Sequence, residues 1–152
     1  MCMIFPASSA ARPSAAARIR GGALAPGLRG DAQFYQRRDG VLIRIRVVGL
    51  PASETGFFAL HIHEGGSCAG EGFPATGGHY NPGLVPHPQH AGDLPPLLSC
   101  HGMAEAEVLT DRFTVRGILG RTLVIHSGPD DFHTQPSGNP GDKIACGQIL
   151  RV

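Results

Sequence analysis

The chain has 152 residues, with 13 lysines and arginines against 12 acidic residues, and a formal net charge of +1. This length fits one domain with a hydrophobic core of its own. The near-neutral charge argues against nucleic acid or an anionic membrane as the natural partner, although it leaves room for a local positive patch. No apolar run approaches the roughly 20 residues of a membrane-spanning helix.

The N-terminal segment differs in composition from the rest. Residues 1–14 are rich in alanine, serine and proline, which predicts a disordered tail followed by a single domain over residues 15–152. The segment lacks a basic start, and its apolar run is shorter than the ~7–15 residues of a signal peptide. We therefore expect a cytoplasmic protein, with an altered export signal as the alternative.

Short segments with alternating apolar and polar residues dominate the domain. Residues 41–48 show the pattern well, with apolar side chains at every second position and arginines between them. Asp39-Gly40 just before them fits a hairpin turn. In chain order, the predicted strands are residues 15–20, 32–36, 41–48, 57–63, 103–109, 112–115, 120–126 and 144–152. About eight short strands without a helix predict an all-β fold, an antiparallel sandwich or barrel.

Two long segments interrupt the strands. Residues 64–93 and 127–142 are rich in glycine and proline and show almost no apolar periodicity. A structureless loop of about 30 residues is unusual inside a compact domain. A bound metal can order such a segment in place of a hydrophobic core.

His61 and His63 lie two residues apart at the end of the predicted strand 57–63. Side chains alternate along a strand, so both imidazoles point to one face while Ile62 points to the other. Together with His126, at the end of a later strand, they offer three nitrogens that suit copper, zinc, iron or nickel. A histidine alone is more often a surface or hydrogen-bonded residue.

A second group lies in the first long loop: His79, His87, His90 and Asp93. Three imidazoles and a carboxylate form a closed tetrahedral set of the kind that zinc accepts. The alternative is a polar loop that happens to be rich in histidine. Closed four-ligand sites are structural, whereas a site with an open position is catalytic.

Five blocks in this order resemble the copper/zinc superoxide dismutases, with loops as short as in bacterial members. The resemblance runs from about residue 15 to the C-terminus. The blocks are His61-Ile-His-Glu, Gly77-Gly-His-Tyr-Asn-Pro, His90-Ala-Gly-Asp-Leu, Gly120-Arg-Thr-Leu-Val-Ile-His and Gly138-Asn-Pro-Gly-Asp-Lys-Ile-Ala-Cys-Gly. The resemblance implies an eight-stranded antiparallel Greek-key β-barrel with two long metal-site loops.

The resemblance also implies an activity: two superoxide anions become dioxygen and hydrogen peroxide as copper alternates between Cu(II) and Cu(I). In the family pattern, copper would be bound by His61, His63, His79 and His126. Zinc would be bound by His79, His87, His90 and Asp93. His79 would therefore bridge the two metal ions and deliver a proton toward peroxide.

The family pattern assigns roles to further residues. Asp130 would hydrogen-bond His61 and His87 and so orient them, although Asp131 is an equal candidate by chemistry alone. Cys68 and Cys146 would form a disulfide. Lys143 stands where the family usually has an arginine that draws in superoxide; lysine keeps the charge but loses the planar fork.

Two rival functions remain open at the level of sequence. One is a non-enzymatic dismutase-like domain, as in a copper chaperone, and the other is a structural zinc domain. Cys2 and Cys100 match nothing in the family pattern, nor do His101 and His133, which we expect at the surface. A homodimer is compatible with the family. The expected disulfide favours export, to the periplasm for example, over the cytoplasmic assignment.

Overall fold

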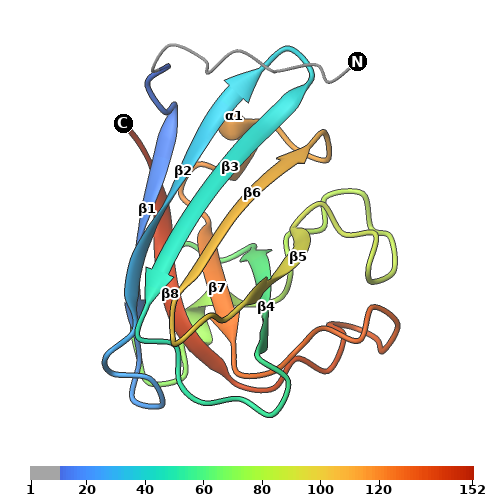
Figure 1. Ribbon diagram of the computed structural model, residues 1–152. Helices are drawn as coiled ribbons and strands as arrows, with labels where there is room; N and C mark the ends of the chain where they lie inside the picture. The colour runs from blue at the N-terminus through green and yellow to red at the C-terminus, as the bar shows by residue number, and fades with distance from the viewer. Residues whose placement is uncertain (1–10) are drawn as a thin grey trace, which may run out of the picture.

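The computed structural model describes residues 11–152, and eight antiparallel strands form one sheet that curls into a nearly closed barrel (Figure 1). The order across the sheet is β5-β4-β7-β8-β1-β2-β3-β6, so β3→β4 and β6→β7 cross over, as in a Greek key. The strands are β1 (Ala15–Gly21), β2 (Arg29–Arg37), β3 (Gly40–Val48), β4 (Phe57–His63), β5 (Asp93–Leu98), β6 (Ala104–Thr110), β7 (Thr122–His126) and β8 (Lys143–Arg151).

The interior of the barrel is the main hydrophobic core. Phe34, Ile43, Leu60, Ile62 and Leu123 are among its fully buried side chains. On β2 and β3 the alternate residues are exposed or half-buried, as the alternation in the sequence predicted. The predicted hairpin is present, and Arg37 pairs with Gly40 across its turn.

The sequence predicted a strand over residues 112–115 and no helix, and both predictions were wrong. Residues 112–115 are not a strand: Thr114 caps a short helix, α1 (Val115–Ile118), whose Gly117 N–H donates to the Thr114 side chain. Val115 and Ile118 lie three residues apart and are both buried, which one helical turn explains. A short 3-10 helix, η1 (Pro74–Thr76), lies in the first long loop.

The strand missing from the predictions is β5, of which only the first residue, Asp93, was assigned to the long loop. Pro95 and Pro96 lie within it. Proline lacks the N–H that a central strand donates, but an edge strand tolerates it. β5 is hydrogen-bonded on one side only, to β4, and lies beside β6 at the seam where the barrel closes.

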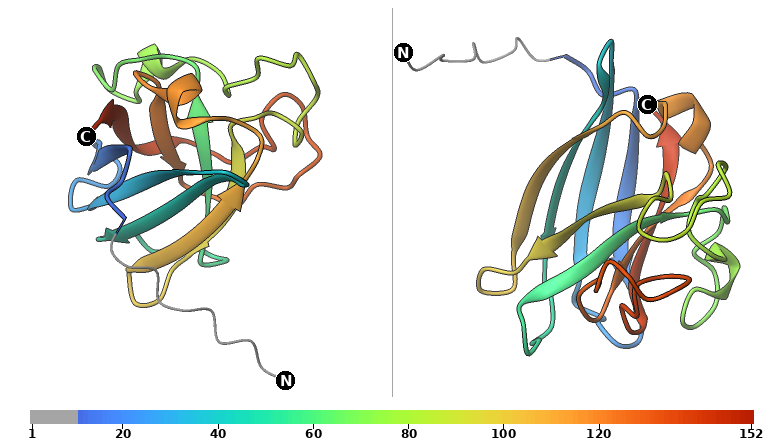
Figure 2. Two further views of the ribbon diagram at one scale, coloured as in Figure 1. Left: turned by 90° about the horizontal axis from the view of Figure 1, so that it is seen from above. Right: turned by 90° about the vertical axis from the view of Figure 1, so that its right-hand side faces the viewer.

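The outer face of β4, β7 and β8 is covered by the two long loops, residues 64–92 and 127–142 (Figures 1 and 2). The Cys68–Cys146 disulfide ties the first loop to β8, across a sequence separation of 78 residues. Phe73 and Val124 pack with Cys146 there in a second, smaller core. This cover explains why six of the seven residues of β4 are buried, on both of its faces.

Residues 11–14 lead into β1, and the C-terminal strand β8 pairs with β1. Within residues 11–14, the Ser14 N–H donates to Phe34 O. The first ten residues of the predicted tail, including Cys2, lie outside the described residues. Among residues 11–152, no helix is long and apolar enough to cross a membrane.

Candidate metal centre

The strand β4 positions two histidines on the outside of the barrel, under the loops. Ile62 points into the core, so His61 and His63 point outward, as predicted. The neighbouring strand β7 ends at His126. All three imidazoles are buried, with 0%, 2% and 3% of their residue surface exposed.

The first long loop returns to β4 and brings His79 beside His63. The two residues form a β-bridge, and the Tyr80 N–H donates to Ile62 O at 2.8 Å. His61 and His79 have ring centroids only 3.9 Å apart. One ligand atom from each of His61, His63, His79 and His126 lies within 4.8 Å of the others.

Backbone carbonyls fix the proton positions on two of these imidazoles. The Nδ1–H of His63 donates to Gly77 O at 2.8 Å, and His126 Nδ1 lies 3.4 Å from Gly141 O. Their Nε2 atoms then carry lone pairs, which face each other at 3.2 Å. Burial lowers the pKa of His63 to about 2 and that of His126 to about 3, so both rings stay neutral near pH 7.

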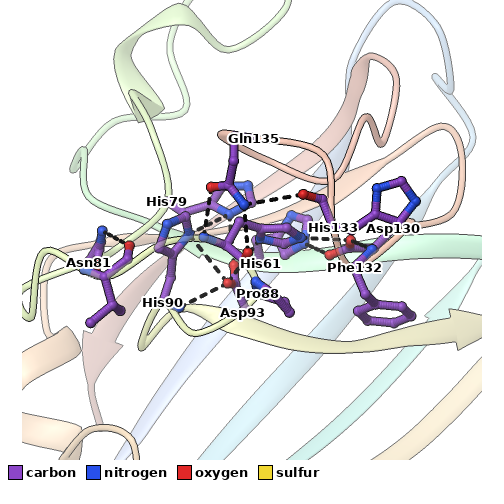
Figure 3. Close-up of polar contacts among 12 residues, drawn as sticks. His61, His79, Asn81, Pro88, His90, Asp93, Asp130, Phe132, His133 and Gln135 are labelled. Carbon is purple, nitrogen blue, oxygen red and sulfur yellow. Dashed lines mark hydrogen bonds and ion pairs between the residues drawn. The ribbon is translucent and has the colours of Figure 1, made fainter.

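The second cluster surrounds Asp93, at the start of β5 (Figure 3). Its Oδ1 lies 2.8 Å from His79 Nδ1, and its Oδ2 lies 3.0 Å from His87 Nδ1 and 3.3 Å from His90 Nδ1. Burial opposes ionisation of this carboxyl, but the hydrogen bond with His79 and the nearby imidazoles lower its pKa. His79 therefore presents one nitrogen to each cluster.

Asp130 links the two clusters from the second loop (Figure 3). Its two oxygens accept from His61 Nε2 and His87 Nε2, each at 2.8 Å. Burial opposes its ionisation, but the hydrogen bonds from His61, the Phe132 N–H and His87 outweigh burial and lower the pKa of Asp130. Asp131, the alternative, is only partly buried and bonds within its own loop.

The donor atoms fit metal ions. Because His61 and His87 donate their Nε2–H to Asp130, their Nδ1 atoms carry lone pairs directed into the clusters. Among the buried side-chain atoms of residues 11–152, His61 Nδ1, His79 Nε2 and His87 Nδ1 have no hydrogen-bond partner. Buried acceptors that face one another without a shared proton are stabilised by a cation between them. The first cluster offers four imidazoles and the second three imidazoles and a carboxylate, sets that suit copper and zinc respectively.

The first cluster opens to solvent, and His90 of the second cluster borders the same hollow. A hollow of about 510 Å³ has His63, His79, His126 and Lys143 in its lining. The Lys143 ammonium donates to Thr76 Oγ1 at 2.7 Å and to Gly77 O at 3.1 Å, and burial lowers its pKa. The first cluster thus has room for a small anion beside a cation.

Two side chains that the sequence analysis missed hold the loops around the centre. Gln135 bonds both backbone groups of His87, accepting from its N–H at 2.9 Å and donating to its carbonyl at 2.7 Å. Arg112 donates to the carbonyls of Pro88 and His90. Both act on backbone atoms, which leave no motif in the sequence. His101 and His133 are exposed, as expected.

Comparison with known proteins decides the family. A family model for copper/zinc superoxide dismutase (SODC) matches residues 28–149. The chain belongs to the copper/zinc superoxide dismutase family. Superoxide dismutase [Cu-Zn] 2 of Aquifex aeolicus is 39% identical over 135 residues, which cover 79% of this chain and 78% of the relative. Superoxide dismutase [Cu-Zn] of Deinococcus radiodurans is 36% identical over 144 residues, covering 81% and 78%.

Solved structures agree with this membership and with the Greek-key barrel. The Cu/Zn superoxide dismutase of Brucella abortus superposes with a TM-score of 0.75 at 28% identity, covering 88% of this chain and 97% of that chain. A SOD-like protein of Bacillus subtilis gives 0.78 at 30% identity, covering 89% and 97%. Copper/zinc superoxide dismutases form an oxidoreductase family with copper and zinc as cofactors, and the two histidine clusters of this chain are compatible with both ions.

Proposed function

We propose that this copper/zinc superoxide dismutase converts two superoxide anions to dioxygen and hydrogen peroxide at the centre built from the two clusters. His61, His63, His79 and His126 would hold copper, and His79, His87, His90 and Asp93 would hold zinc. Copper supplies the one-electron chemistry by alternating between Cu(II) and Cu(I), whereas zinc has no redox chemistry. The observation that carries the proposal is the sharing of His79, whose Nδ1 faces Asp93 while its Nε2 faces the first cluster without a partner.

His79 is also placed to handle a proton. Its Nε2 is buried within the first cluster, whose other three histidines surround it. A proton held on this atom lies beside the hollow, where the product peroxide needs protons. Asp93, on the other side of the ring, keeps the imidazole oriented while the proton is held or released.

Lys143 would dock the substrate anion. Two of its three N–H groups are used by Thr76 and Gly77, which leaves one for an anion in the hollow. The same Gly77 carbonyl accepts from His63, so the lysine is fixed relative to a ligand of the first cluster. A positive charge at the mouth also raises the encounter rate with an anion.

Replacing His79 tests the shared ligand. His79→Gln should weaken the binding of copper and of zinc together, because each cluster loses one nitrogen. His101→Gln, which changes an exposed histidine, is the matched control and should leave both affinities unchanged. Competition with chromophoric chelators measures each affinity. If His79→Gln weakened one metal only, His79 would not be a shared ligand.

The compartment and the oligomeric state remain predictions. The Cys68–Cys146 disulfide supports an oxidising compartment, and therefore the exported alternative rather than the cytoplasmic expectation. Trapping thiols in intact cells tests this: a cytoplasmic pool would carry both cysteines reduced. Sedimentation equilibrium of the metal-loaded protein tests the expected homodimer.

A further inference from the structure

On the side away from the long loops (Figures 1 and 2), the outer face of the barrel has two parts that differ in how their charged side chains are paired. Between β3 and β6, each arginine faces an acid. Arg44 lies 2.6 Å from Glu107, and Arg46 lies 3.0 Å from Glu105. Opposite charges at directly facing positions stabilise an antiparallel pair.

Between β1 and β2, one of the two charged facing pairs has opposite charges and the other has like charges. Arg20 of β1 lies directly opposite Arg29 of β2, and Arg18 lies opposite Asp31. Like charges at facing positions destabilise a sheet. Within residues 11–152, the guanidinium groups of Arg18, Arg20 and Arg29 form no hydrogen bond and no ion pair. The fold therefore keeps a repulsive pair, Arg20 and Arg29, that forms no ion pair with an acid of residues 11–152.

These arginines border a hollow. Arg18, Arg20, Arg29 and Arg46 line a depression of about 340 Å³ on the exposed face of β1–β3, and Asp31 is the one acid in its lining. Because Arg46 is paired with Glu105, three unpaired arginines remain against Asp31, and this positive excess makes the depression an attractive site for an anion. Its volume lies at the lower end of the roughly 300–1,000 Å³ of small-ligand pockets.

We propose that this arginine hollow, defined by Arg18, Arg20, Arg29 and Arg46, binds a phosphate ester. Guanidinium groups match phosphate oxygens with two parallel N–H donors, and arginine is favoured wherever phosphate is recognised. Arg20 and Arg29 would hold the anion from adjacent strands, because an anion between them turns their repulsion into two attractive contacts. The bound anion would be flanked by Arg46, which is already paired with Glu105, and by Arg18, which lies opposite Asp31.

The position of the hollow separates it from the metal centre. It lies over β1, β2 and β3, whereas the metal centre lies on β4 and β7, which β8 separates from β1. The views of Figure 2 agree that the loops around the metal centre lie on the other side of the barrel. A ligand in the arginine hollow would leave the entrance to the metal centre open. The source of the phosphate is a lipid headgroup or a soluble ester.

Binding of sn-glycerol 3-phosphate tests the proposal, measured by isothermal titration with the copper- and zinc-loaded protein. The double variant Arg20→Gln/Arg29→Gln should lose at least about tenfold in affinity, because it removes two charged donors. The control Arg12→Gln/Arg38→Gln makes the same change in net charge at two exposed arginines outside the hollow, and should change affinity less than twofold. No binding by the wild type, or the same loss in both variants, would overturn the proposal.

Vesicles distinguish the two sources. The wild type is sedimented with phosphatidylcholine vesicles that contain or lack phosphatidic acid. Sedimentation that needs phosphatidic acid and is lost in Arg20→Gln/Arg29→Gln identifies a lipid headgroup. A selective loss of glycerol phosphate binding without any sedimentation identifies a soluble ester. The double variant should unfold at the same or a higher temperature, since the like-charge pair is gone, and should consume superoxide at the wild-type rate.

Discussion

Asp130→Asn is the substitution whose effect follows most directly from the geometry of the centre. Asp130 has two acceptor oxygens, and each receives an N–H from one imidazole at 2.8 Å. Asparagine is nearly isosteric but has one acceptor and one donor group. One of the two imidazoles must then face an NH2 group, so it has to rotate or move its proton to Nδ1. Either change removes a ligand from its cluster.

The imidazole that gives way should be that of His87. His61 is fixed on strand β4, whereas His87 lies in the first long loop. The Phe132 N–H also donates to the oxygen that serves His87, but Phe132 lies on an exposed loop where water can replace the bond. Loss of such an orienting partner typically lowers metal affinity 10–100-fold. We expect a loss of about 1.4–2.7 kcal/mol in the free energy of zinc binding.

Chelator competition at constant pH measures the zinc affinity of Asp130→Asn. Asp131→Asn is the matched control, since it removes the same charge one residue away, where the carboxylate bonds only within its loop. The control should stay within about threefold of the wild type, well below the 10–100-fold loss. Zinc affinity unchanged in Asp130→Asn, or equally lowered in Asp131→Asn, would refute the orienting role.

Three further predictions concern Lys143 at the entrance to the metal centre, the disulfide and the metal-free protein. Lys143→Ala should slow superoxide consumption at low ionic strength and weaken the dependence of the rate on salt, whereas Lys143→Arg should preserve the rate and its salt dependence. An unchanged salt dependence in Lys143→Ala would contradict the docking role of Lys143. Reducing Cys68–Cys146 should lower the free energy of unfolding by up to about 4–5 kcal/mol, measured by denaturant unfolding, and an unchanged free energy would contradict this prediction. Burial lowers the pKa values of His63 and His126, so the unfolded chain binds more protons than the folded chain below pH 6.5. The free energy of unfolding of the metal-free protein should therefore fall by about 1.4 kcal/mol per pH unit for each histidine below pH 6. A flat profile between pH 6 and 4.5 would contradict this prediction.

The sequence predicted the barrel well where alternation was the deciding signal. Apolar residues occupy every second position from Val41 to Val47, which fixes the buried face of β3, and the turn at Asp39-Gly40 sets its register with β2. β5 was missed because Pro95 and Pro96 read as loop residues, and only its edge position makes them acceptable. The helix α1 was missed because four residues are too few for a periodic pattern.

The site was predictable where chemistry is carried by side chains of characteristic spacing. His61 and His63 share a face because of the strand period, and His79 and Asp93 meet as the family pattern implied. Gln135 was not predictable, since its partner is the backbone of a residue 48 positions away. Gly138 is a similar case: it has φ +81°, and a Cβ there would lie 2.6 Å from His87 Nε2. A glycine in a glycine-rich loop gives no sign of such a close approach.

The most direct test of the account is superoxide consumption by protein of measured copper and zinc content. The account predicts about one copper and one zinc ion per chain, and a rate that depends on copper and greatly exceeds that of the zinc-only protein. A non-enzymatic dismutase-like domain or a structural zinc domain would give no turnover. Protein fully loaded with both metals that fails to consume superoxide would contradict the central claim.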